Sequence, residues 1–256
     1  MFKRFEFLQA GKHKDLRFTE SGGYSYAATE ALIPLVLHEI PEAAREFPII
    51  FPNNGQDMPC ALVGLEPERN AYVGEDGRWL GTYVPAHLRR YPFRFGSVAG
   101  RSDLLLAFDP DAPHFSGEEG EPVFAADGKL SPAVERRVDL LKRVQADAGP
   151  TRRLVQELRT AGVLAERTIA IRRQGEPERR ISGLQGVDEQ KLGALSDADF
   201  ASLRRGALPL AYAQLLSWAN LWRGPLVKMY PDLGKQTGQS HSASIEPSTI
   251  DFSFLS

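Results

Sequence analysis

The stretch WLGTYVPAHLRRYPFRF, residues 79–95, joins many of the chain's aromatic side chains to its densest group of basic ones. Its candidate ligand-binding residues are Trp79, Tyr83, His87, Arg89, Arg90 and Tyr91. Guanidinium groups bind carboxylates or phosphates in a bidentate manner, and aromatic faces stack on planar ligands. The stretch therefore suggests a binding site. The alternative, which we favour here, is a structural role in which the rings fill the core, one arginine is solvated and the other pairs internally.

The segments on either side of this stretch indicate β-structure. Apolar runs at residues 47–51, 61–65 and 71–73, followed by 79–84, predict an antiparallel meander. Pro85–Arg90 is expected to form one helical turn, which ends before the Tyr91-Pro92 step because a residue that precedes proline is disfavoured in a helix. A further strand is predicted at Leu104–Phe108.

The N-terminal region gives two more predictions. Phe2, Phe5 and Phe7 alternate in part with charged residues, which favours a short edge strand. Ala27–Leu37 carries apolar residues at three- and four-residue spacings, which favours a short helix or turn.

The second half of the chain is mostly helical by pattern. Ser131 is a good N-cap with Pro132 behind it, and the helix is expected to run to Gly149-Pro150, after which Thr151 caps a second helix. A hairpin of residues 168–171 and 180–184 is expected to rejoin the first sheet. Further helices are predicted at Asp188–Leu192, Ser196–Leu203 and Leu208–Trp222.

These elements predict an α+β fold, with an antiparallel or mixed sheet flanked by helices that come mostly from the C-terminal half. Residues 1–233 are expected to form a single domain with a lobe boundary near residue 130. Residues 234–256 are rich in Gly, Ser, Thr and His, which predicts a flexible, disordered tail. The tail ends in a strand-like apolar pattern that would add to the chain's own sheet or dock on a partner, with Ile250, Phe252 and Phe254 as its contact residues.

Composition excludes several classes of protein. The chain has 31 Lys and Arg against 33 Asp and Glu, so it lacks the basic surplus of a dedicated nucleic-acid binder. Its single cysteine, Cys60, excludes an internal disulfide. No window approaches the roughly 20 apolar residues of a membrane span, and no secretory signal is visible, so we expect a soluble, cytoplasmic protein without integral membrane association.

The strict catalytic and cofactor motifs are also absent from the sequence. It contains no dinucleotide-binding glycine fingerprint, phosphate loop, nucleophile elbow, paired CxxC or HExxH helix. The five histidines are scattered, so we expect no metal site and no cofactor. The absence of these motifs therefore favours a non-catalytic protein over an enzyme.

The order of motifs resembles the bacterial SapC-like protein family from about Lys12 to about Leu221. The most specific pieces are YVPAHLRRYPF at residues 83–93 and the later VDEQKL…LP…YAQLLS series; the others are HKDLRF, FPIIF, PCALVGL and LLLAFD. The family name comes from a gene at a surface-layer locus, and the resemblance carries over no reaction and no catalytic residues. It implies an accessory role beside nutrient-uptake receptors, cupin-like proteins and tryptophan-halogenase-like flavoproteins.

Three functions stay open from the sequence. The first is a non-catalytic accessory protein that binds a partner protein or a small ligand, and a homo-oligomer is compatible with it. The second is an enzyme whose site lies in residues 79–95, with His87 or Tyr91 in proton transfer. The third is a surface-layer or secretion component, which would need a non-classical export route that reads the terminal IDFSFLS.

Overall fold

The computed structural model describes residues 1–20, 23–53, 55, 57–97, 100, 104–115, 120–171 and 179–233. Its strands are β1 Glu6–Phe7, β2 Arg17–Phe18, β3 Leu32–Pro34, β4 Ile49–Pro52, β5 Cys60–Leu62, β6 Phe93–Gly96, β7 Leu105–Phe108, β8 Glu121–Pro122, β9 Leu164–Ile171 and β10 Arg179–Val187. Its α-helices are α1 Ile40–Ala43, α2 Ala86–Arg89, α3 Pro132–Thr160, α4 Glu189–Gly193, α5 Asp197–Leu203, α6 Ala207–Ser217 and α7 Gly224–Met229. Short 3₁₀ turns are η1 Ser25–Ala27, η2 Leu37–Glu39, η3 Pro113–Phe115 and η4 Trp218–Trp222.

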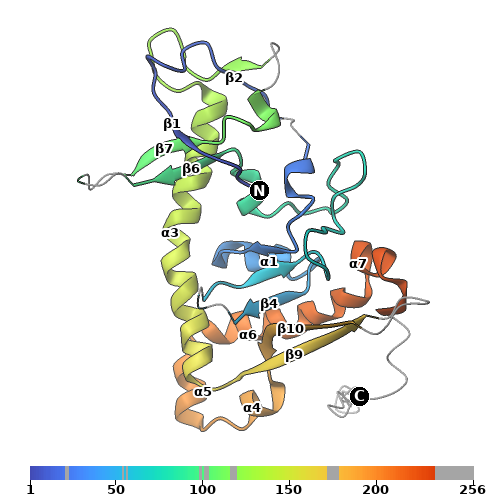
Figure 1. The fold of residues 1–256 in the computed structure, drawn as a ribbon. Coiled ribbons are helices and arrows are strands. Elements are labelled where there is room, and N and C mark those ends of the chain that lie inside the picture. The colour runs from blue at the N-terminus through green and yellow to red at the C-terminus, as the bar shows by residue number, and fades with distance from the viewer. Residues whose placement is uncertain are drawn as a thin grey trace, which may run out of the picture.

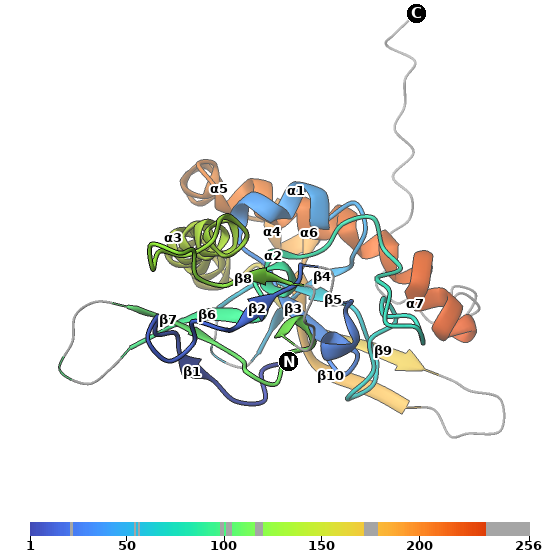
Figure 2. The same cartoon turned by 90° about the horizontal axis from the view of Figure 1, so that it is seen from above.

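The described strands form antiparallel sheets of different sizes. The larger sheet has the order β3-β5-β4-β10-β9, a smaller one has the order β1-β7-β6, and β2 pairs with β8. Most of the helical residues follow residue 131, and helices α1, α3, α4, α5 and α6 gather on one side of the larger sheet (Figure 2). The α+β fold with antiparallel sheets and mainly C-terminal helices is confirmed.

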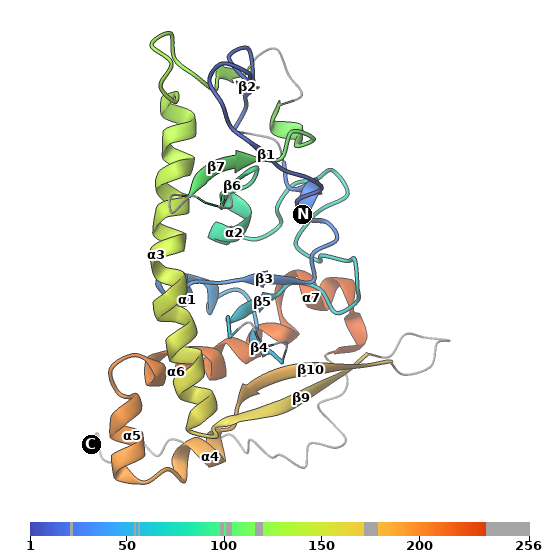
Figure 3. The same ribbon diagram turned by 60° about the vertical axis from the view of Figure 1, so that its left-hand side comes forward.

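The long helix α3 connects the two larger sheets. It runs from the β1-β7-β6 sheet at its N-terminal end to the β9-β10 hairpin at its C-terminal end (Figures 1 and 3). Its residues Val155 and Leu158 belong to the core of the five-stranded sheet. Near its start, Val134 and Leu141 pack into a second core around Phe18, Phe93 and Phe108. One helix therefore holds both cores together.

The prediction of two helices separated at Gly149-Pro150 is wrong, because α3 continues through Pro150. Proline in a helix interior removes one hydrogen bond, and its ring crowds the residue before it. Here the preceding residue is Gly149, which has no Cβ to meet that ring. The Thr151 hydroxyl donates to the Asp147 carbonyl at 2.7 Å and accepts from the Leu37 N–H at 2.9 Å. These two hydrogen bonds stabilise the turn of α3 that contains Pro150 and join it to η2.

The prediction of a helix or turn over Ala27–Leu37 is wrong for its second half. Leu32–Pro34 is a strand, β3, that pairs with β5 at the edge of the larger sheet. An edge strand accommodates Pro34, which has no N–H to give to a ladder. In the first half, residues 28–29 form a turn, which follows η1 and agrees with the prediction.

The meander prediction holds for β4 and β5 but fails after them. Residues 71–84 form only an isolated bridge between Val73 and Trp79. The backbone N–H groups of Thr82 and Tyr83 donate to the carboxylate of Glu46. Because this carboxylate supplies their acceptor, these N–H groups do not need a partner strand.

Cys60, in β5, is buried as a free thiol, and burial raises its pKa to about 12.

The predicted hairpin rejoins the first sheet, as expected. Strand β10 pairs with β9 on one side and with β4 on the other. Helix α6 is fastened to this sheet by Gln214, whose side chain accepts from the Val187 N–H at 2.8 Å and donates to the Ile49 carbonyl at 3.0 Å. The predicted helices α4, α5 and α6 and the edge strand β1 are confirmed.

Candidate functional site

The stretch 79–95 forms a corner of the core that is held by two glutamates. Glu39 is 2 % exposed and accepts from the Tyr83 hydroxyl at 2.7 Å, the Ala86 N–H at 2.5 Å and the Val36 N–H at 3.2 Å. Glu46 accepts from the N–H groups of Thr82 and Tyr83 and from the Thr82 hydroxyl at 2.7 Å. Together the two carboxylates fix the irregular chain that leads into α2.

Two of the six candidate residues, Trp79 and Tyr83, are engaged within this corner. The Trp79 indole N–H donates to the Tyr83 carbonyl at 2.8 Å. The indole ring stacks on Tyr72 with ring centres 5.6 Å apart. Tyr83 donates its hydroxyl to Glu39, and burial and that carboxylate raise its pKa. Both side chains serve the packing of the corner.

His87 and Arg90 lie together on a second face of the corner, away from Arg89. One guanidinium nitrogen of Arg90 lies 3.2 Å from Nδ1 of His87, and the guanidinium sits over the Phe2 ring at 5.5 Å. Burial and the charge of Arg90 lower the pKa of His87 to about 3, so this imidazole is neutral at pH 7. Burial and then the charge of Arg94 lower the pKa of Arg90 to about 10.

Tyr91 is buried in an aromatic cluster. It is 3 % exposed, stacks on Tyr26 with ring centres 4.1 Å apart, and donates its hydroxyl to Oδ2 of the buried Asp109 at 3.2 Å. His114 lies against both tyrosine rings and stacks on Phe18 at 5.9 Å. Burial and the charge of Arg137 lower the pKa of His114 to about 4.

The low pKa of His114 predicts acid destabilisation. An unfolded histidine has a pKa of about 6.5, so between about pH 6.5 and 4 the unfolded chain binds a proton that the folded chain does not. The stability due to neutral His114 is therefore present above that window and is lost as the pH falls through it. His114→Phe keeps an aromatic ring at this position but has no group that titrates. Between pH 7 and pH 5, its free energy of unfolding in urea should fall by about 2 kcal/mol less than that of the wild type. If the free energy of unfolding fell by the same amount in the two proteins over this pH range, the prediction would be contradicted.

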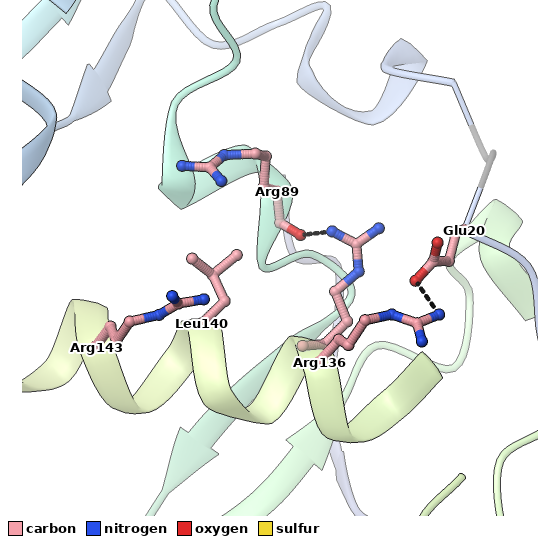
Figure 4. Close-up of a pocket in the computed structure, with 6 residues that line it drawn as sticks. Glu20, Arg89, Arg136, Leu140 and Arg143 are labelled. Carbon is pink, nitrogen blue, oxygen red and sulfur yellow. Dashed lines mark hydrogen bonds and ion pairs between the residues drawn. The ribbon is translucent and has the colours of Figure 1, made fainter. Parts of the chain in front are cut away.

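Arg89 is the candidate residue that faces a cavity. A cleft of about 290 Å³ opens between α2 and the first half of α3, and it is lined by Glu20, Arg89, Arg136, Arg137, Leu140 and Arg143 (Figure 4). We call these residues the arginine cleft. Its lining residues include four arginines and one glutamate, an excess of three formal positive charges (4 − 1).

Internal contacts use only part of this positive charge. Arg137 donates to the Arg89 carbonyl, and Nε of Arg89 donates to the Val84 carbonyl at 2.8 Å. Glu20 forms an ion pair with Arg136 at 3.2 Å. Within the part of the chain that the structure describes, neither Arg89 nor Arg143 pairs with a carboxylate. The cleft can therefore accept an acidic group from outside.

A second hollow adjoins the cleft along α3. It measures about 480 Å³ and is lined by Arg136, Asp139, Lys142 and Arg143, so Arg136 and Arg143 border both cavities. Asp139 and Lys142 form an ion pair at 3.1 Å within it. Arg136 and Arg143 are seven residues apart, which places them on one face of the helix. That spacing is visible in the sequence, but it does not show that Arg89 lies opposite.

The structure thus separates the six candidate residues. Arg89 borders the arginine cleft, and His87 and Arg90 share another face. Tyr91 is buried, and Trp79 and Tyr83 are half-buried against the core. The expected docking residues Ile250, Phe252 and Phe254 lie outside the described residues. Among the described residues, no cluster of His, Cys, Asp and Glu is arranged to hold a metal ion, and no helix combines the length and apolar character of a membrane span.

Comparison with known proteins identifies a family for this chain. No curated protein and no solved structure matches the chain significantly. The family model SapC matches residues 8–223, well over half of the chain, which includes α2, the corner and the arginine cleft. This agrees with the resemblance seen in the motifs, and the chain belongs to the SapC family.

Proposed function

We propose that the protein is a non-catalytic accessory protein that binds an acidic group of a partner protein or small ligand in the arginine cleft. The observation that carries this proposal is the convergence of four arginines from two helices on one cavity that contains a single carboxylate. A guanidinium presents a rigid fork of donors that matches a carboxylate or phosphate. The SapC family setting of nutrient-uptake and flavoprotein-halogenase-like systems suits a binding role of this kind.

Two features support binding over catalysis. The imidazole of His87 has a pKa near 3 and contacts Arg90 instead of the cleft. The hydroxyl of Tyr91 is committed to the buried carboxylate of Asp109, and burial and that carboxylate raise its pKa. A general acid or base works best with a pKa near the operating pH, at the edge of the substrate site. Neither group meets both conditions.

The proposal is tested with Arg143→Ala and three acidic probes: pyrophosphate, citrate and a short polyglutamate peptide. Calorimetric titration at low ionic strength should detect binding of at least one probe to the wild type. Loss of a charge-assisted hydrogen bond should weaken that binding about tenfold in Arg143→Ala. Arg143 is chosen because its side chain supports no ion pair among the described residues, so its removal should leave the fold intact.

The matched control is Arg152→Ala, an exposed arginine further along the same helix. This variant removes the same charge from α3 without touching the cleft, so it should bind the probes like the wild type. The proposal is overturned if no probe binds, or if Arg143→Ala and Arg152→Ala bind equally well.

A further inference from the structure

We infer that the occupant of the arginine cleft is an extended acidic segment of a partner protein, which crosses α3 and replaces Glu20 on Arg136. This inference rests on the proposed function and adds the class of partner to it. It draws on the shape of the surface, on the spacing of its charges and on the position of Glu20.

The shape favours a segment of chain over a small molecule. Cavities for small ligands are concave and mostly apolar, with a few polar groups. The two adjoining hollows lie open on the surface along α3, and their lining residues are charged except for Leu140. Recognition of acidic protein segments by clustered arginines uses surfaces of this kind.

The spacing of the charges favours an extended chain. Arg136 and Arg143 are separated by two helical turns, about 10 Å along the axis. In an extended chain of the polyproline II type, with three residues per turn and a rise of about 3.1 Å, acidic residues three positions apart lie on one face, about 9 Å from each other. Between the arginines lies the ion pair of Asp139 and Lys142, which has no net charge and so gives no attraction to a third acidic group there. The surface therefore fits a segment in which two uncharged residues separate successive acidic ones.

Glu20 occupies the place that such a segment would take. Its carboxylate lies 3.2 Å from Arg136, and the side chains are 49 % and 60 % exposed. An exposed ion pair contributes little to stability, so an incoming carboxylate can replace it at small cost. Removing the charge of Glu20 should then strengthen binding of the segment about two- to fivefold.

Nucleic acid and membrane surfaces fit this surface less well. The chain carries 33 acidic against 31 basic residues, so a long polyanion would meet repulsion beyond the arginine cleft. A short acidic segment is confined to the basic area. Charge complementarity therefore selects a protein segment as the occupant.

The experiment measures fluorescence anisotropy with the full chain and a labelled peptide of about twelve residues that has glutamate at every third position. The proteins are the wild type, Glu20→Gln, Arg143→Ala and Arg152→Ala, each checked for an unchanged thermal midpoint. We expect Glu20→Gln to bind the peptide two- to fivefold more tightly than the wild type. Arg143→Ala should bind about tenfold more weakly, and Arg152→Ala should bind equally well.

Competition with other polyanions tests the class of occupant. We expect pyrophosphate, citrate, phosphatidylserine vesicles and single-stranded RNA to compete more weakly than unlabelled peptide. Tighter binding of pyrophosphate or citrate, still sensitive to Arg143→Ala, would overturn the inference and leave the proposed function standing. Tighter binding of vesicles or RNA, or no gain in Glu20→Gln, would also overturn it. If no probe binds, both the inference and the proposed function fail.

Discussion

Glu39→Ala should lower the free energy of unfolding by about 3–5 kcal/mol, because one buried carboxylate satisfies three donors. These are the Val36 N–H, the Tyr83 hydroxyl and the Ala86 N–H, at 3.2, 2.7 and 2.5 Å. Each buried donor left without a partner costs about 1–3 kcal/mol. The variant would also loosen the entry to α2, and with it the position of Arg89 in the cleft.

The control for this prediction is Glu42→Ala. Glu42 lies three residues further along, is 60 % exposed and pairs with Arg45 at 3.5 Å on the surface. Its replacement should change the free energy of unfolding by less than about 1 kcal/mol. Urea unfolding of both variants provides the measurement. A loss in Glu39→Ala no larger than that in Glu42→Ala would show that the corner does not depend on this carboxylate.

Gly64→Ala should be the second severe substitution, with a loss of at least about 3 kcal/mol in the free energy of unfolding. A Cβ at this position would lie 1.8 Å from the backbone oxygen of Arg69 and 3.3 Å from Cα of Ala31. Both obstacles are backbone, so no side-chain rotation relieves them. The Gly64 N–H also donates to the Ala31 carbonyl at 3.1 Å, which holds the two segments at this distance.

Gly193→Ala is the matched control for steric crowding. Gly193 ends α4, and a Cβ added there meets nothing within 4 Å. Alanine has the higher helix propensity, so this variant should be neutral or up to about 1 kcal/mol more stable. If thermal unfolding gave the two glycine variants the same midpoint, the close approach at Gly64 would be contradicted.

The sequence was sufficient to predict elements whose own residues determine their structure. The apolar runs predict strands β4 and β7, and the N-cap residues predict helices α4 and α5. It was insufficient where a distant group decides the structure. Strand β3 has helical spacing but pairs with β5, and the chain after Val73 avoids a ladder because Glu46 supplies the acceptor.

The candidate site was predictable only in part, for a similar reason. Arg89 and Arg90 are adjacent on a helical turn, so their side chains point about 100° apart. The sequence shows that they diverge but not which of them meets a cavity. The arginines that complete the cleft come from α3, more than forty residues later, and tertiary packing alone brings them opposite α2.

The central claim is that an acidic partner contacts the arginine cleft instead of the aromatic face of the corner. The most direct measurement is an NMR titration of the full chain with the acidic peptide, following the arginine Nε–H signals and the Trp79 indole N–H signal. The account predicts that the Nε–H signals of Arg136 and Arg143 shift together and saturate, while the Trp79 signal, held by its bond to the Tyr83 carbonyl, stays in place. A saturating shift at Trp79 with unchanged signals from these two arginines would contradict it.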